Sequence, residues 1–168
     1  EAVYNGQSYS VNRGITSSSS LYELVENHYI QLETTQSITN VGKIDNNEII
    51  AESIKIYDKD GNNVTEYYEI VDTLTSSLIV YQREIQIETS DLSFVYDGNE
   101  HVLDSFITLD DQLIYSHIIS YDDSFKNVRD SNNNFELDSS SFIIRDKDGN
   151  DVTSNYKITL KNSSCKVE

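Results

Sequence analysis

Apolar and polar residues alternate along much of the chain. Alternating runs lie at residues 85–87, 92–96 and 156–160, and their apolar positions hold Ile, Leu, Phe and Tyr. Successive side chains of a β-strand point to opposite faces, so this pattern predicts strands that are buried on one face. Spacing typical of a helix occurs at residues 18–29, where we expect a loop with at most a short helix. The pattern therefore predicts an all-β protein.

Turn signals separate the predicted strands. Asn5-Gly6 and Asp97-Gly98 predict type I′ hairpin turns, in which both central residues have positive φ. The Asp-Gly-Asn sequences at residues 60–62 and 148–150 predict turns of the same kind. Two polar stretches predict exposed loops, at residues 43–48 and 129–134. Many short strands joined by turns favour small sandwich-like (Ig-like) or β-grasp-like folds.

The chain contains much of this pattern twice. Residues 54–70 read IKIYDKDGNNVTEYYEI, and residues 142–158 read FIIRDKDGNDVTSNYKI. In the same way AVYNGQ at residues 2–7 is matched by FVYDGN at residues 94–99. Because the matching blocks keep their order, we predict a tandem repeat of roughly 85 residues.

The repeat defines two predicted modules. Module one spans residues 1–82, and module two spans residues 83–168. Module two opens with REIQIETSDLS at residues 83–93, and nothing comparable stands before AVYNGQ in module one. We therefore expect module one to lack the opening strand.

The net charge and the cysteine content exclude some partners and some kinds of protein. The 168 residues carry a net charge of −17, which argues against binding to nucleic acids or anionic membranes. The single cysteine, Cys165, excludes an intrachain disulfide. No apolar run is long enough for a membrane helix or a signal peptide, so we expect no membrane insertion of this segment. We expect the sequence to be part of a larger protein.

Several of these motifs resemble a known class of repeats. The Tyr-Asn/Asp-Gly opening, the middle at residues 40–42 and the closing Asp-Gly-Asn-x-Val-Thr are similar to YDG- and MBG-type modules of bacterial surface proteins. Those modules are grouped with bacterial Ig-like and mucin-binding-type repeats. The strand that joins them commonly reads Arg-x-Ile-x-Ile, as residues 83–87 do here. Module two departs from the pattern at Arg129, where module one has Gly42.

The resemblance implies a function without catalysis. It implies an extracellular stalk, spacer or adhesin on the cell wall or surface of a bacterium, with neighbouring repeats of the same chain as its partners. Two alternatives remain open: a binding module for a host glycan or protein, and accessory domains of a larger secreted enzyme. A Lys–Asn crosslink within a module also remains open, as do oligomeric state and ligand.

The loops at residues 58–62 and 146–150 suggest a calcium hypothesis. Both read Asp-Lys-Asp-Gly-Asn, and alternating carboxylate and amide oxygens suit Ca²⁺. The glycine is fourth from the first Asp rather than sixth, and Lys157 stands where module one has Glu69, so the pattern does not fit an EF-hand. We interpret the loops as turns and predict no metal site and no cofactor.

No set of residues predicts catalysis. His28 and His117 occupy matching positions, which indicates a shared structural role, while His101 follows a turn. Cys165 matches Leu78 and is interpreted as a small buried residue. A nucleophile needs a base and the base an orienting partner, and the sequence shows no such set. We therefore predict that the chain is not an enzyme.

The tyrosines divide into two groups. Four recur at matching positions and are predicted in the core: Tyr4, Tyr68, Tyr96 and Tyr156. The others that we weigh are freer to be exposed: Tyr22, Tyr29, Tyr57, Tyr67 and Tyr115. A contiguous patch among the second group would indicate an adhesive surface.

Overall fold

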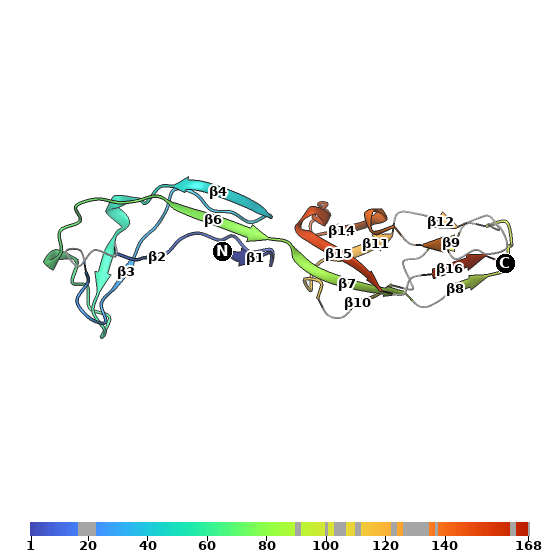
Figure 1. Cartoon of the computed structure of the whole chain (residues 1–168), viewed down its shortest axis with the longest axis horizontal. Helices are drawn as coiled ribbons and strands as arrows, with labels where there is room; N and C mark the ends of the chain where they lie inside the picture. Colours follow the sequence, from blue (N-terminus) through green and yellow to red (C-terminus); the bar gives the residue numbers. More distant parts are fainter. Residues whose placement is uncertain are drawn as a thin grey trace. The chain divides into compact units, whose positions relative to one another are not determined.

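The computed structural model divides into two compact units, Glu1–Tyr81 and Gln82–Glu168 (Figure 1). The structure describes residues 1–16, 23–89, 92–99, 101–102, 107–109, 112–121, 124–125, 135–136, 138–161 and 164–167. These residues form many short strands and a few one-turn 3-10 helices. The chain is thus β-rich, as the alternation predicted.

The described residues of unit one form six strands in two three-stranded sheets. The sheet orders are β1-β6-β4 and β2-β3-β5. The strands are β1 (Ala2–Val3), β2 (Arg13–Gly14), β3 (Tyr29–Gln31), β4 (Gly42–Asn47), β5 (Lys55–Tyr57) and β6 (Ser76–Tyr81). Two 3-10 helices accompany them, η1 (Ala51–Ser53) and η2 (Thr65–Tyr67).

Alternation explains the core of unit one. In β6 the inward positions Leu78 and Val80 are buried, while their neighbours are more exposed. Ile56 of β5 is buried in the same way between a half-buried and an exposed neighbour. Strands β5 and β6 are therefore each held by one apolar face, as the period of two requires.

The polar stretch at residues 43–48 corrects a sequence prediction. We expected a loop, yet most of it belongs to β4, which pairs antiparallel with β6 through Ile44 and Leu78. The strand carries a bulge between Ile44 and Asn47, with Asn46 at φ 57°. Tertiary pairing with an apolar partner strand therefore outweighs the polar composition of β4. The matching stretch at residues 129–134 lies outside the described residues.

Hydrogen bonds of the Asn47 side chain stabilise that bulge. Its side chain is fully buried, and its Oδ1 accepts from the backbone N of Gln36 at 2.9 Å. Its Nδ2 donates to Thr34 Oγ1 at 3.0 Å and to the Gln36 carbonyl at 3.2 Å. These hydrogen bonds of the buried side-chain amide fix the segment at residues 34–36 against the end of β4.

Unit two contains ten strands and two 3-10 helices within the described residues. Its sheets have the orders β10-β7-β15, β11-β14, β12-β9 and β13-β16-β8. The strands are β7 (Arg83–Thr89), β8 (Leu92–Phe94), β9 (His101–Val102), β10 (Ile107–Leu109), β11 (Ile118–Tyr121), β12 (Ser124–Phe125), β13 (Phe135–Glu136), β14 (Phe142–Arg145), β15 (Tyr156–Lys161) and β16 (Ser164–Val167). The helices are η4 (Ser139–Ser141) and η5 (Thr153–Asn155).

Strand β7 forms the centre of the largest sheet in unit two. It pairs antiparallel with β10 and parallel with β15 over six residue pairs, from Tyr156 with Arg83 to Lys161 with Glu88. Its Ile85 and Ile87 are buried almost completely. The Arg-x-Ile-x-Ile pattern is therefore a core strand.

The turn signals gave the right places but the wrong turn type. Gly6 and Gly98 have φ near +80°, while neither Asn5 nor Asp97 has positive φ. Instead Asn5 Oδ1 accepts from the backbone N of Gln7 at 2.8 Å. An Asx side chain that bonds to the backbone two residues on stabilises the turn without a left-handed first residue.

The stretch at residues 18–29, predicted as a loop with at most a short helix, is described only from residue 23 onward. Residues 23–28 contain a turn, with the His28 N donating to the Val25 carbonyl at 3.0 Å, and no helix. Asn27 has φ 65° within this turn.

Candidate functional site

The two Asp-Lys-Asp-Gly-Asn loops have the same geometry. In unit one the Asp58 N donates to the Asn62 carbonyl at 3.0 Å, and the Gly61 N donates to the Asp58 carbonyl at 3.1 Å. The corresponding bonds in the second loop, between Asp146 and Asn150 and between Gly149 and Asp146, are both 3.0 Å. Gly61 and Gly149 both have φ 84°. Each loop is a hairpin turn followed by a left-handed glycine.

The first aspartate of each loop is bonded by its own loop. Asp58 Oδ1 accepts from the backbone N of Asp60 and of Asn62, both at 2.9 Å, and Oδ2 accepts from Asn62 Nδ2 at 2.9 Å. Asp146 accepts the same three bonds at 2.9, 2.9 and 3.0 Å. Bonds from the Asn side chain, and then from the backbone, hold the pKa of both carboxyls below their usual range.

These bonds account for the residues that suggested calcium. Both oxygens of each first Asp already serve as acceptors for the turn, so the turn explains the Asp, the Gly and the Asn together. Among the described residues, His, Cys, Asp and Glu form no group of three or more that could hold a metal ion.

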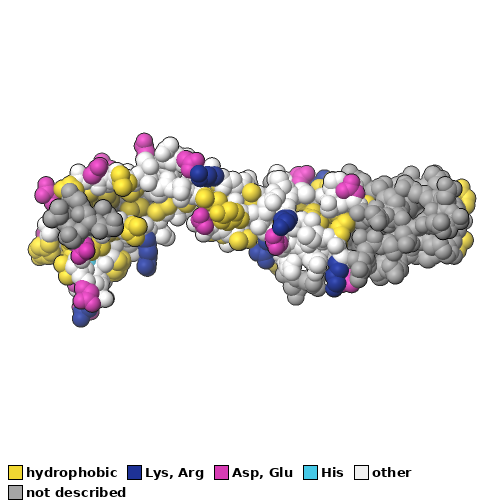
Figure 2. Space-filling view, in the orientation of Figure 1, with side chains coloured by type: hydrophobic (Ala, Val, Ile, Leu, Met, Phe, Trp, Pro, Cys, Tyr) yellow, Lys and Arg dark blue, Asp and Glu magenta, His cyan; other side chains and the backbone are white. Residues whose placement is uncertain are grey.

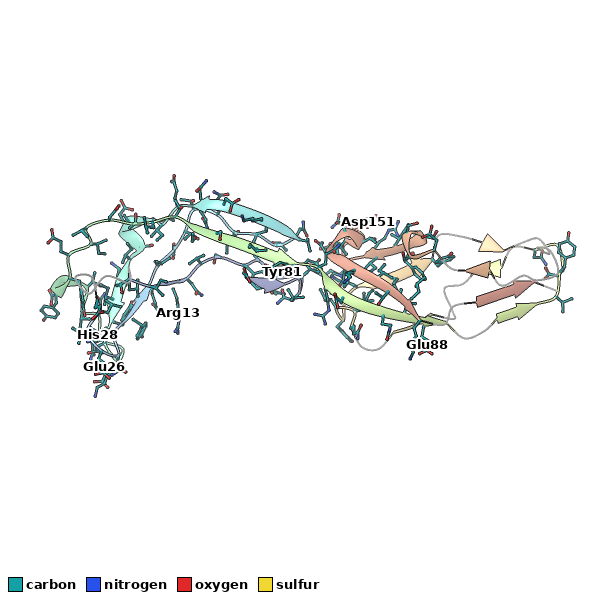
Figure 3. The ribbon with its side chains drawn as sticks, in the orientation of Figure 1. Arg13, Glu26, His28, Tyr81, Glu88 and Asp151 are labelled. Atoms are coloured by element: carbon teal, nitrogen blue, oxygen red, sulfur yellow. The ribbon has the colours of Figure 1, made fainter. Side chains whose placement is uncertain are left out.

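A threonine beyond each loop extends the same network. Thr65 Oγ1 accepts from the backbone N of Ile56 at 2.8 Å, and Thr153 Oγ1 accepts from the backbone N of Ile144 at 2.8 Å. Both threonines also bond to the side chain two residues before, Asn63 or Asp151 (labelled in Figure 3). The repeated Val-Thr was visible in the sequence, but the strand amide that each threonine satisfies was not.

The matching histidines each bond to a tyrosine. His28 Nδ1 lies 2.7 Å from Tyr68 Oη, and His117 Nδ1 lies 2.7 Å from Tyr156 Oη. The ring planes cross at 65° in the first pair and 69° in the second. Figure 3 labels His28 beside the start of β3. The shared role that the sequence indicated is thus a tie between the start of one strand and the residue that follows a 3-10 helix.

Burial distinguishes the histidine of unit two. His117 is buried, and this desolvation lowers the pKa of its imidazole, although the charge of Asp146 acts in the opposite direction. The positions of His101 and Cys165 are described only as backbone, in β9 and β16.

The tyrosines of the predicted core are only partly there. Tyr4 and Tyr156 are buried, and Tyr68 is half-buried. Tyr96 is 53 % exposed, so the prediction that it lies in the core is wrong. Tyr96 follows β8 as Tyr4 follows β1, and Tyr4 donates its backbone N to the Tyr81 carbonyl at 2.9 Å.

An aromatic cluster lies on the sheet of β2, β3 and β5. The rings of Tyr29 and Tyr57 stack with centroids 5.5 Å apart, and the Arg13 guanidinium lies 5.8 Å from the Tyr29 ring centre. The two tyrosines are directly paired across β3 and β5. The corresponding pair in unit two is Ile118 with Arg145, so the cluster is a feature of unit one alone.

Tyr67 and Tyr115 are highly exposed, while Tyr22 lies outside the described residues. Figure 2 shows apolar and acidic side chains interspersed over the described part of the visible face. A continuous aromatic surface common to both units is not formed by the described tyrosines.

Comparison of the sequence with models of known protein families finds no match, and neither curated proteins nor solved structures yield one. No helix among the described residues has the length and apolar character needed to cross a membrane. The assignment of function below therefore depends on the residues and geometry of this chain.

Proposed function

We propose that the two units are non-catalytic spacer modules that carry tensile load in an extracellular bacterial surface protein. The observation that carries the proposal is the parallel pairing of the first and last segments of each unit. They run parallel and side by side, so a force that pulls the two ends apart loads their hydrogen bonds in shear. In this geometry many bonds must break together, whereas pulling from one end breaks them singly.

Unit two has the longer parallel pairing between its first and last segments. Strand β7 pairs parallel with β15 over six residue pairs, and β8 pairs parallel with β16 over three more. These four strands point the same way in Figure 1, with β8 following β7 and β16 following β15 in the sequence. The first and last segments of the unit are thus joined along nine residue pairs.

Side chains reinforce the same connection. Gln82 Nε2 donates to the carbonyls of Ser154 and Tyr156, at 3.1 and 3.3 Å. Thr159 Oγ1 donates to the Ile85 carbonyl at 3.1 Å. The burial of Ile85 and Ile87 also adds a hydrophobic contribution to the stability of the β7–β15 pair, which solvent-exposed hydrogen bonds do not supply.

Unit one has the same arrangement in shorter form. Strand β1 pairs parallel with β6 at two positions, Ala2 with Val80 and Val3 with Tyr81. One further backbone bond extends it, from the Tyr4 N to the Tyr81 carbonyl. We expect unit one to be the mechanically weaker of the two.

The remaining parts of the proposal have separate support. Repeated turns and ties made by matching residues favour two copies of one scaffold over a dedicated active site. The bacterial and extracellular assignment is supported by the resemblance to surface-protein repeats. Binding of a host glycan or protein is less favoured, because the Tyr29–Tyr57 cluster has no counterpart in unit two.

For the finer fold we favour a small two-sheet, sandwich-like module over a β-grasp. Unit one has two separate three-stranded sheets. Its described residues contain 3-10 turns but no α-helix that could pack across a single sheet, as a β-grasp requires.

The test is single-molecule stretching of the chain held at its two ends. We expect two unfolding steps, each releasing roughly 270–310 Å of extended chain, with the step of unit one at the lower force. Unfolding of the whole chain in a single low-force step, or a gradual extension without steps, would contradict the spacer proposal.

A further inference from the structure

Asn5-Gly6 is the one Asn-Gly sequence in the chain, and it lies in an exposed bend after β1. Three other glycines have φ near +80°, and each of them follows an aspartate: Gly61, Gly98 and Gly149. A backbone nitrogen can attack the side-chain carbon of the residue before it most easily when it belongs to a glycine, because no Cβ obstructs the approach. The structure distinguishes among these four sites.

The backbone nitrogen of Gly6 is available for such an attack. Within the described part of the chain it donates no hydrogen bond, and both Asn5 and Gly6 are exposed. In the Asp-Gly-Asn loop of unit one, by contrast, the Gly61 N donates to the Asp58 carbonyl at 3.1 Å, and the loop of unit two has the same bond at 3.0 Å. A nitrogen held in that bond can react only after the turn has opened.

The side chain of Asn5 is held in a conformation that favours the attack. Its Oδ1 accepts from the backbone N of Gln7 at 2.8 Å, and the ring that this bond closes contains both the Asn5 amide carbon and the Gly6 nitrogen. Negative charge develops on Oδ1 when the nitrogen attacks that carbon, and an N–H already directed at the oxygen stabilises the charge. The bond that fixes the turn therefore also activates the amide.

The matching turn of unit two has the same arrangement with an aspartate. The Asn99 N donates to Asp97 Oδ1 at 2.8 Å, and Gly98 has φ 80°, compared with 78° at Gly6. An ionised carboxylate is a poorer electrophile than an amide, so Asp97 should react by the same route more slowly. This turn also shows that an aspartate at the position of Asn5 is compatible with the fold.

We propose that Asn5 is a site of spontaneous deamidation in the folded chain, with water as the only co-reactant. The Gly6 nitrogen gives up its proton and bonds to Asn5 Cγ, the Cγ–Nδ2 bond breaks, and ammonia leaves with that proton. The product is a cyclic imide. Water then opens the ring at Cγ to give aspartate, or at the backbone carbonyl carbon to give isoaspartate. This inference does not depend on the spacer function.

Both products change the surface beside β1. Each adds a negative charge at neutral pH, because an amide becomes a carboxylate. Isoaspartate also lengthens the backbone by one carbon next to Tyr4, whose N bonds to the Tyr81 carbonyl at the end of β6.

The test incubates the folded chain at mildly alkaline pH and follows it by peptide mass analysis. We expect the peptide of residues 1–13 to gain about 1 Da, as ammonia is replaced by water, with both aspartate and isoaspartate found at residue 5. The rate should exceed that of every other asparagine in the described residues by at least about ten-fold. The Asn5→Gln variant should not change, since its longer side chain cannot form the same ring. An Asn5 that keeps its amide would overturn the proposal.

The three Asp-Gly sequences provide the matched control in the same samples. In the folded chain we expect isoaspartate at Asp97 and at least about ten-fold less at Asp60 and Asp148, whose glycine nitrogens are bonded. In chain unfolded by guanidinium chloride we expect it at all three aspartates. Equal isoaspartate at the three aspartates of the folded chain, or deamidation of Asn5 only after unfolding, would show that the folded turn does not select the site.

Discussion

At the scale of residues, the polar side chains of the repeated motifs form hydrogen bonds within their own motif or with the strand beside it. The first Asp of each Asp-Gly-Asn loop accepts bonds from the backbone and side chain of the same loop, and the following Thr satisfies a strand amide. The same bonds recur in unit two at nearly the same lengths. Polar residues that suggested a metal site are thereby explained as parts of a turn.

The glycine of the loop provides the first prediction. Gly149 has φ +84°, and a Cβ placed there would meet no atom within 4 Å, so substitution acts through the backbone alone. Gly149→Val should lower the free energy of unfolding of unit two by about 1–3 kcal/mol, and Gly149→Asn should lower it less because Asn tolerates positive φ. Chemical denaturation measures both. Equal losses for Val and Asn would show that backbone conformation is not the cause.

The buried histidine provides a prediction about pH. Burial lowers the pKa of His117 in the folded state below its ordinary value of 6.5, so the unfolded chain binds the proton more readily. The resulting stability is fully present above pH 6.5 and is lost as the pH falls below it. Melting temperatures between pH 7.5 and 5.5 should fall for the native chain and fall less for His117→Gln. The idea fails if the variant is as sensitive to pH as the native chain.

At the scale of elements, the alternation of apolar and polar residues predicted the strands that form the core. It did not predict a strand whose formation depends on pairing with a neighbouring strand. The Ile-x-Ile of β7 and the apolar face of β6 could be predicted because their inward residues recur at every second position. Strand β4 could not, since it has mainly polar residues and depends on β6 for its backbone bonds. The bulge at Asn47 depends on a buried amide whose partners are at least eleven residues away.

The turns and the histidine–tyrosine contacts show the same limit to what the sequence can predict. The places of the turns followed from Gly, but the turn type depended on whether the Asx side chain bonds to the backbone. Matching positions identified His28 and His117 as related, whereas their tyrosine partners lie about 40 residues away and could only be found in the fold. Tyr96 shows that matching position does not ensure matching burial.

The largest sheet of unit two provides the prediction at this scale. Ile87 of β7 is completely buried, so Ile87→Ala should cost about 2–5 kcal/mol of the stability of unit two. Val95→Ala is the control, because Val95 is 77 % exposed and should change stability by less than about 0.5 kcal/mol. Amide exchange in β14 and β15 measures unit two separately from unit one. A loss as large in unit one would contradict two independent cores.

At the scale of the whole molecule, the two units share one strand arrangement and differ in the length of its parallel pairing. Each joins its first and last segments in parallel, but unit two does so along nine residue pairs and unit one along two. The predicted difference in mechanical strength follows from this difference in pairing length.

The most direct measurement compares two pulling directions on unit two within the same chain. Both variants carry Cys165→Ala and Gln82→Cys, with the second handle at Lys161→Cys or at Ser154→Cys. Residues 82 and 161 lie at opposite ends of the β7–β15 pair, and residues 82 and 154 lie at the same end. The account predicts a clearly higher unfolding force for the 82/161 pair, since its bonds are loaded in shear. Equal forces in the two directions would contradict the claim that these strands carry load.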